Sequence, residues 1–224
     1  MISKNKIALA ITATLFAGSL SAASLDARQE YKHGSEEWAS RIKMSGSVDN
    51  HFFGAEMKQK GKPFSDWEAA DNEFEYGYQI KLNDQWMIQP SMPVTFGSES
   101  ITYKPQVRVQ YSFDSGLKAK LRYRHEFRDY TSDSLKENLN RSKITGNLDY
   151  NWNAFQFGFE ANYAEDFANN KWTAGGGADY EWDYNIKVGY KEADWNWRPY
   201  VEFGNVQDGS DRQLRSRVGV SYSF

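Results

Sequence analysis

The sequence predicts an all-β protein, a transmembrane antiparallel up-and-down β-barrel of about 12 strands. Three observations predict this class: apolar and polar side chains alternate along most of the chain, short and long connections take turns, and aromatic residues gather near the ends of the alternating segments. The 224 residues include 14 Tyr, 14 Phe and 8 Trp but no cysteine, and the mean hydropathy is -0.77. This hydropathy excludes a bundle of transmembrane helices, and the many rings exclude a disordered chain. The lack of cysteine excludes disulfide scaffolds, thiolate metal sites and cysteine nucleophiles.

The first 23 residues have the layout of a secretory signal peptide. Lys4 and Lys6 precede an apolar run over residues 7–20, and small residues follow up to Ala23, after which we expect cleavage. The remaining segment, 24–224, is the predicted outer-membrane barrel. Without the two lysines, 25 basic residues remain against 30 acidic ones, a formal charge of -5. Export and the barrel pattern together predict the outer membrane of a Gram-negative bacterium.

Alternation with a period of two is clearest in two neighbouring segments. Residues 101–113 and 117–128 each place mostly apolar or aromatic side chains at odd positions and polar or charged ones at even positions. Only Asp114 to Gly116 separate them, so the pair predicts a tight hairpin. The same pattern along the chain predicts strands over residues 25–33, 37–46, 51–60, 73–83, 86–96, 101–113, 117–128, 140–152, 155–164, 180–191, 196–205 and 213–224.

The connections between these strands differ in length on the two sides of the predicted sheet. After even-numbered strands they are short turns, whereas after odd-numbered strands they include the long polar segments 61–72, 129–139 and 165–179. Short periplasmic turns and long external loops are typical of outer-membrane barrels. A soluble β-sandwich is the alternative, but strands of this length suit a tilted crossing of a bilayer better.

The ends of the strands carry further signals of a membrane barrel. Rings such as Trp86 and Tyr150 lie on the apolar face near strand ends, so we expect two interfacial girdles in contact with outer-membrane lipid. The chain also ends by alternating from Val218 through Tyr222 to a terminal Phe224. This ending resembles the signal by which the barrel-assembly machinery recognises its clients, so that machinery is an expected partner during biogenesis.

If the apolar residues face lipid, the alternate positions line the lumen, and two groups of cations stand out there. The first basic group comes from the sixth to eighth predicted strands and consists of Lys104, Arg108, Lys118, Lys120, Arg122, Arg124, Arg128, Arg141 and Lys143. The second basic group comes from the last strand and the first two, and consists of Arg28, Lys32, Arg41, Lys43, Arg215 and Arg217. These groups lie on opposite walls of a twelve-stranded barrel. The second is the weaker one, because Asp26, Glu30 and Glu37 point inward beside it.

The basic groups predict a pore for a linear polyanion. Residues on one face of a strand stand about 7 Å apart, so Lys120, Arg122 and Arg124 form a ladder along which carboxylates could move. More acidic walls lie between the two groups, through Glu56, Glu73, Glu75, Glu160 and Glu202. The alternative is that the cations only neutralise inward acids and fill the lumen. A barrel of about 12 strands is wider than a filled eight-stranded one, which favours the channel.

Several short motifs resemble the oligogalacturonate-specific porin family of the KdgM type. They are Leu-Asp-Ala-Arg-Gln-Glu-Tyr at 25–31, Leu-Arg-Tyr-Arg at 121–124, Thr-Gly-Asn-Leu-Asp-Tyr at 145–150, Trp-Arg-Pro-Tyr-Val-Glu-Phe-Gly-Asn-Val at 197–206 and Arg-Val-Gly-Val-Ser-Tyr-Ser-Phe at 217–224. The resemblance covers essentially the whole mature chain, and sialate-induced channels are relatives of this family. Segment 164–179 matches nothing in it.

The resemblance implies a monomeric twelve-stranded channel for acidic oligosaccharides, with arginine tracks along a narrow pore. The tracks carry over at Arg122 and Arg124 in the matching run, at Arg198, and at Arg215 and Arg217. The other predicted pore-lining residues rest on alternation alone, and they are Arg41, Lys43, Arg108, Lys120, Arg128, Arg141 and Lys143.

A barrel lipase or protease is the alternative from a different class. Such enzymes need a histidine paired with a serine or an acid, and none of His33, His51 and His125 lies in a recognisable catalytic motif. Nucleic-acid binding is not expected, because the rings point away from the cations instead of forming a stacking platform. We therefore expect a channel that is not an enzyme and has no metal or cofactor. The expected substrate is oligogalacturonate, with alginate-type oligouronates or sialic acid as alternatives.

Overall fold

The computed structural model describes residues 22–63, 65–131, 138–167, 179–208 and 211–224. The predicted signal segment lies outside these ranges except for Ala22 and Ala23, which begin the first strand. The predicted loops over 129–139 and 165–179 are described only at their ends. Among the described residues, no helix is long and apolar enough to cross a bilayer.

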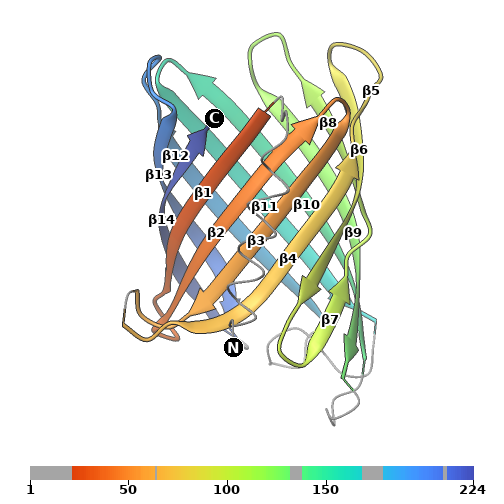
Figure 1. The fold of residues 1–224 in the computed structure, drawn as a ribbon, viewed down its shortest axis with the longest axis vertical. Coiled ribbons are helices and arrows are strands. Elements are labelled where there is room, and N and C mark those ends of the chain that lie inside the picture. Colours follow the sequence, from red (N-terminus) through yellow and green to blue (C-terminus); the bar gives the residue numbers. More distant parts are fainter. Residues whose placement is uncertain (1–21, 64, 132–137, 168–178, 209–210) are drawn as a thin grey trace, which may run out of the picture.

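The described residues form one antiparallel sheet rolled into a barrel (Figure 1). Its strands are β1 (Ala22–Lys32), β2 (Glu37–Val48), β3 (His51–Lys60), β4 (Glu68–Tyr78), β5 (Ile80–Lys81), β6 (Trp86–Phe96), β7 (Ser100–Tyr103), β8 (Gln106–Ser112), β9 (Lys118–Tyr130), β10 (Leu139–Trp152), β11 (Phe155–Asp166), β12 (Tyr180–Tyr190), β13 (Trp197–Asp208) and β14 (Asp211–Ser223).

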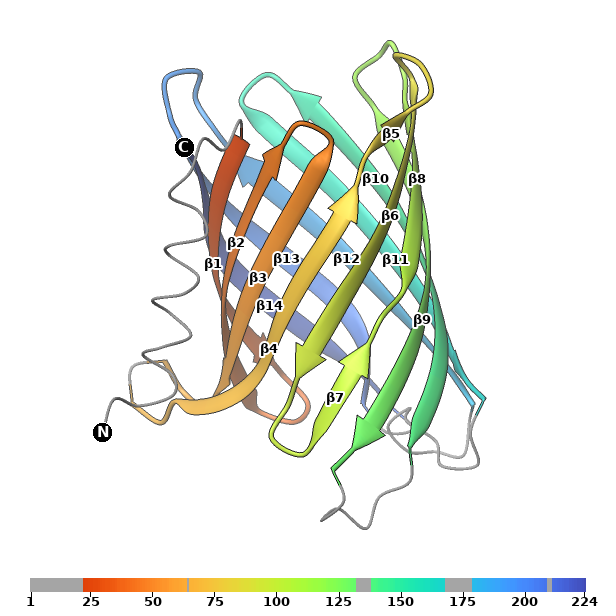
Figure 2. The ribbon, with the colours of Figure 1, turned by 45° about the vertical axis from the view of Figure 1, so that its right-hand side comes forward.

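The fourteen strands of the described residues form twelve segments that each cross the barrel wall once, and we call these segments staves. Two staves are each built from two consecutive strands. β4 and β5 form one stave, and β7 and β8 form another, since both members of each pair hydrogen-bond along β6. Pairing of β14 with β1, from Ser24 opposite Ser223 to Lys32 opposite Arg215, closes the sheet. Figure 2 shows the tilted staves surrounding the central space. The predicted fold class is confirmed, and closure leaves no free sheet edge.

Two strands differ from their predicted extents for physical reasons. β4 begins at Glu68 rather than at residue 73, so the preceding loop is shorter than expected. Residues 68–72 at its start include no large apolar side chain, so alternation does not reveal that the strand continues beyond the apolar band. The predicted strand 101–113 is interrupted at Pro105, which has no N–H to donate. The chain stays attached there, because Pro105 O accepts the N–H of His125 at 3.0 Å.

The usual distribution of apolar and polar residues is inverted in this barrel. Leu121 and Ile186 are each 59% exposed on the outside, and Val218 is 64% exposed, whereas Thr145 is 1% exposed on the inside. The outward face is therefore suited to the hydrocarbon of a bilayer, and the polar residues form the interior.

Aromatic rings lie at both ends of the outward face, as predicted. Beside the short turns, the rings of Trp197 and Tyr222 have centroids 4.4 Å apart. At the opposite end, Tyr163 and Trp182 have centroids 4.6 Å apart. These levels correspond to the two headgroup regions, where amphipathic rings are most favourable.

One inward-facing ring fills space against a glycine of the neighbouring strand. Tyr200 on β13 is 4% exposed, and its hydroxyl donates to Asp26 Oδ1 at 3.1 Å. A Cβ added to Gly219 on β14 would lie 2.4 Å from Tyr200 Cζ and 2.9 Å from the carbonyl oxygen of Ala27. Because a backbone atom limits this space, the ring cannot simply rotate away.

We therefore expect Gly219→Ala to lower the free energy of unfolding by about 1 to 3 kcal/mol through overpacking. Gly146→Ala on β10 is the control, because a Cβ there meets no atom within 4 Å. Urea unfolding in detergent micelles, followed by tryptophan fluorescence, measures both variants. Equal stability of the two would contradict the packing described for Tyr200.

Candidate functional site

All the sequence-predicted pore-lining residues occupy inward positions of the barrel wall. Strand register makes neighbours of cations from different strands: Arg108 lies opposite Arg122, and Lys143 lies opposite Arg124. In the second basic group, Arg28 lies opposite Arg41. The order of the sheet separates the two groups by the staves β3, β4 and β6 on one side and by β11, β12 and β13 on the other.

The second basic group is neutralised by acids on its own strands and on nearby strands. Its ion pairs are Arg28 with Glu30 (3.9 Å), Lys32 with Glu37 (2.8 Å), Arg41 with Asp26 (2.5 Å) and Glu56 (3.4 Å), Lys43 with Glu75 (4.0 Å), Arg215 with Glu30 (4.0 Å), and Arg217 with Glu30 (2.6 Å) and Glu202. Every member of this group thus has a carboxylate within ion-pairing distance.

The first basic group is neutralised only in part. Its ion pairs are Lys104 with Glu73 (2.8 Å), Lys120 with Asp149 (2.7 Å), Arg124 with Glu126 (3.3 Å), and Arg141 with Asp166 (3.6 Å) and Glu181. In the described part of the chain, Arg108, Arg122 and Lys143 have no carboxylate oxygen within 4.0 Å. The ladder predicted from Lys120, Arg122 and Arg124 therefore has one unpaired rung between two paired ones.

Arg198 belongs to neither basic group. It is the second residue of β13, beside the short turn that follows β12, and its Nη1 donates to Gln156 Oε1 at 3.0 Å. No acid within the described ranges pairs with it, so it adds a separate cation near the end of the lumen that carries the short turns.

A hydrogen-bond network built mainly from neutral side chains connects the two basic groups along the wall formed by β10, β11 and β12. We call it the Glu160 network, and it consists of Arg122, Thr145, Asn147, Glu160, Asn162, Asn185 and Arg215. Arg122 Nη2 donates to Thr145 Oγ1 at 2.9 Å, and Thr145 donates to Asn162 Oδ1 at 2.8 Å. At the other end, Arg215 Nη2 donates to Asn185 Oδ1 at 2.8 Å.

Glu160 is the centre of this network. Its Oε1 accepts from Asn162 at 2.8 Å and from Asn185 at 3.1 Å, and its Oε2 accepts from Asn147 at 2.9 Å. The sequence analysis placed Glu160 in the lumen but did not identify the three asparagines as a site. Alternation assigns them to the inward face, but uncharged residues give no signal of function by themselves.

A shorter chain of hydrogen bonds spans the opposite wall. Arg124 Nε donates to Gln106 Oε1 at 2.7 Å, and Gln106 Nε2 donates to Glu75 Oε1 at 2.9 Å. Glu75 is in turn 4.0 Å from Lys43 of the second basic group. Gly54 lies between Lys43 and Glu75, and a Cβ added to it would be in ordinary contact with both side chains, 3.7 Å from Lys43 Cε and 3.6 Å from Glu75 Cβ.

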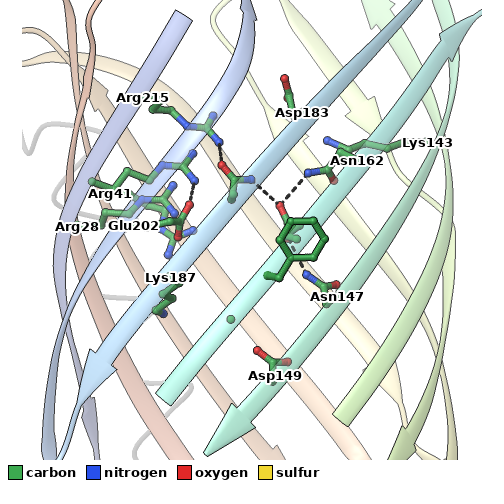
Figure 3. Close-up of a pocket in the computed structure, with 15 residues that line it drawn as sticks. Arg28, Arg41, Lys143, Asn147, Asp149, Asn162, Asp183, Lys187, Glu202 and Arg215 are labelled. Atoms are coloured by element: carbon green, nitrogen blue, oxygen red, sulfur yellow. Dashed lines mark hydrogen bonds and ion pairs between the residues drawn. The ribbon is translucent and has the colours of Figure 1, made fainter. Parts of the chain in front are cut away.

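The lumen contains a cavity of 340 Å³ bordered by both basic groups (Figure 3). Lys143, Asn147 and Asn162 lie on one side of it, and Arg28 and Arg41 lie on the other. The remaining lining residues are Asp149, Gly158, Phe159, Glu160, Asp183, Asn185, Lys187, Glu202, Arg215 and Arg217. A cavity of this composition can hold carboxylates through its cations and sugar hydroxyls through its amides and acids.

The histidines have partners that the sequence analysis did not identify. His125 Nδ1 and Ser142 Oγ are 3.0 Å apart, and His33 Nε2 and Ser216 Oγ are 2.8 Å apart. His51 contacts the hydroxyl of Tyr76 at 2.9 Å. In the residues that the structure describes, no carboxylate bonds to any of these rings, so the third member of a catalytic triad is missing from each.

Comparison with known proteins agrees with this geometry. The model of the family described as oligogalacturonate-specific porin protein (KdgM) matches residues 16–224. The oligogalacturonate-specific porin KdgM of Dickeya dadantii is 34% identical over 173 residues, covering 75% of this chain and 72% of the relative. The N-acetylneuraminic acid outer membrane channel protein NanC of Escherichia coli K12 is 26% identical over 225 residues, covering 91% of each chain.

Solved structures of the same two relatives share the fold. A KdgM porin in complex with disordered oligogalacturonate has a TM-score of 0.68 and 28% identity, covering 90% of this chain and 99% of that one. A NanC porin structure has a TM-score of 0.76 and 23% identity, covering 88% and 98%. The chain therefore belongs to the KdgM family of oligogalacturonate-specific porins.

Proposed function

We propose that this protein is a passive outer-membrane channel that admits anionic oligosaccharides, oligogalacturonates in particular, to the periplasm. The observation that carries the proposal is a closed barrel whose lumen holds cations without acidic partners, at Arg108, Arg122 and Lys143. A fully neutralised interior would serve only to fill the barrel. Cations of the lumen that no carboxylate neutralises are instead available to mobile anions, and one of them, Lys143, lines the 340 Å³ cavity.

The charge pattern suits a chain of sugar acids. An oligogalacturonate carries one carboxylate on each residue, so it can exchange one cation of the lumen for the next without leaving the wall. Alginate-type oligouronates and sialic acid carry the same group and are the alternative substrates. The relative named for N-acetylneuraminic acid favours sialic acid as the substrate. The relative named for oligogalacturonate has the higher identity and favours oligogalacturonate.

We assign different roles to the twelve pore-lining cations. Arg108, Arg122, Lys143 and Arg198 provide charge that no acid neutralises, so they bind substrate carboxylates directly. Seven further cations contact the substrate more weakly, because each already has a carboxylate within 4.0 Å, and they are Arg41, Lys43, Lys120, Arg124, Arg141, Arg215 and Arg217. Arg128 joins this weaker set, because its Nε donates to Thr102 Oγ1 at 3.2 Å.

A transport role needs no catalytic group, metal or cofactor. Two of the histidines contact serines on the outward face, but neither pair includes an orienting acid within the described ranges. In the same ranges, no three His, Asp or Glu side chains are arranged to hold a metal ion. We therefore favour a channel over a barrel lipase or protease, and acidic sugars over nucleic acid as its partners.

We also propose that residues 1–23 are a signal peptide and that the mature protein is a monomer. The barrel closes through β14 and β1 of one chain, so no second copy is needed to complete the sheet. The alternating residues of β14 and the terminal Phe224 would be presented to the barrel-assembly machinery before this closure. Native mass spectrometry of the exported protein should give a single chain that begins at Ser24. A larger assembly or a chain retaining Met1 would contradict this proposal.

We expect sugar acids to block the conductance of the channel in planar bilayers. We expect an anion-selective conductance that trigalacturonate blocks at lower concentration than alginate trimers or sialic acid. Reversing two neighbouring cations, as in Arg122→Glu with Arg124→Glu, should remove anion selectivity because it replaces the centre of the ladder with acids. Reversal potentials in a salt gradient measure this change.

Two outcomes would contradict the proposal. Unchanged selectivity in the double variant would show that the first basic group does not control permeation. Hydrolysis of lipid or peptide by the purified protein, without any conductance, would favour the enzyme.

Unequal pairing of the two basic groups predicts unequal effects on stability. Arg217→Gln leaves Glu30 and Glu202 in the wall with fewer cationic partners, so it should lower the free energy of unfolding by about 3 kcal/mol. Arg122→Gln removes the same charge but leaves no carboxylate unpaired, so we expect less than about 1 kcal/mol. Urea unfolding in micelles compares the variants, and equal losses would contradict the assignment of unpaired and paired cations.

A further inference from the structure

Glu160 differs from two other acids that line the lumen cavity, Glu202 and Asp149, in the kind of partner that holds it. Glu202 is paired with Arg217, and Asp149 is paired with Lys120 at 2.7 Å. Glu160 instead accepts hydrogen bonds from three neutral amides, and no cation of the described residues has a nitrogen within 4.0 Å of it. The three amides therefore hold the Glu160 carboxylate in one orientation, but they do not neutralise its negative charge.

The hydrogen-bonding capacity of Glu160 is not filled. An ionised carboxylate offers about four acceptor positions, two on each oxygen. Asn162 and Asn185 occupy both positions of Oε1, whereas Oε2 accepts only from Asn147. One acceptor position on Oε2 is left, on a side chain that lines the 340 Å³ cavity.

Cations border the same cavity on both sides of Glu160. Lys143 lies on the β10 side, and Arg28, Arg41 and Arg215 lie on the side of the second basic group (Figure 3). A ligand in this space meets donors for its carboxylates and one strong acceptor. Sugar acids carry carboxylates and hydroxyl donors together, whereas polycarboxylates without hydroxyl groups and halide ions carry no such donor.

We propose that Glu160 is a specificity-determining residue, whose Oε2 accepts a hydrogen bond from a hydroxyl group of the passing sugar acid. The Glu160 carboxylate repels every anion and so weakens its binding to some degree. Only an anion that carries a hydroxyl group regains binding free energy, by donating a hydrogen bond to Oε2. The channel thereby prefers sugar acids to bare polycarboxylates of equal charge. This inference rests on the proposed transport function and adds a basis for selecting among anions.

The test compares two blockers of equal charge in planar bilayers. Trigalacturonate has three carboxylates and many hydroxyls, and propane-1,2,3-tricarboxylate has three carboxylates and no hydroxyl. The measured quantity is the ratio of their blocking constants. Glu160→Gln removes the charge, and Glu160→Asp keeps the charge but withdraws the acceptor from the cavity. We expect both variants to reduce the preference for trigalacturonate roughly tenfold.

Asp149→Asn is the matched control. It removes one negative charge from the same cavity, but its carboxylate is already engaged by Lys120. This variant should strengthen block by both compounds to a similar degree and leave their ratio unchanged. Heat-modifiable migration on gels verifies that each barrel is folded, and Glu160→Asp alone decides the question if Glu160→Gln does not fold.

The outcomes separate this inference from the proposed function. An unchanged ratio in Glu160→Asp, with trigalacturonate still blocking the unmodified channel, would overturn the role of Glu160 only. An equal change of ratio in Asp149→Asn would show that Glu160 acts through charge alone and would also overturn it. Absence of any block of the unmodified channel by trigalacturonate would instead contradict the proposed substrate.

Discussion

The rest of the structure depends on the hydrogen-bonded closure of the sheet between β14 and β1. In the hydrocarbon region no water is present to bond backbone groups, so each strand must find partners on both sides. Once the sheet closes, one face of every strand is committed to lipid and the other to the lumen. The cationic interior is a consequence of this arrangement, because every second residue of each strand must point into it.

Charges confined to such an interior are stable only if the wall supports them. The second basic group meets this requirement through carboxylates, which leave it close to neutral, so that its ion pairs stabilise the barrel wall. The first basic group relies partly on neutral groups, as where Thr145 accepts from Arg122. Neutral acceptors bind a guanidinium without cancelling its charge. Unequal support thus produces one wall whose charges are compensated by acids and another that keeps uncompensated positive charge.

Alternation was sufficient to predict most strands, the face of every pore-lining residue and the positions of the rings. It was insufficient where the backbone structure does not follow the alternation of side chains. The start of β4 at Glu68 was missed, because a strand outside the apolar band needs no apolar face. Contacts such as that of His125 with Ser142 were missed because cross-strand pairing joins residues that are distant in sequence.

The fold class, the orientation of side chains and the presence of two basic groups could all be read from the amino-acid order, since a period of two follows directly from strand geometry. Which of those cations are neutralised could be learned only from the folded barrel. Pairing depends on register across several strands, and on side chains long enough to reach them, as where Lys43 passes over Gly54 toward Glu75. The amide-held carboxylate of Glu160 likewise exists only where β10, β11 and β12 bring three asparagines to one point.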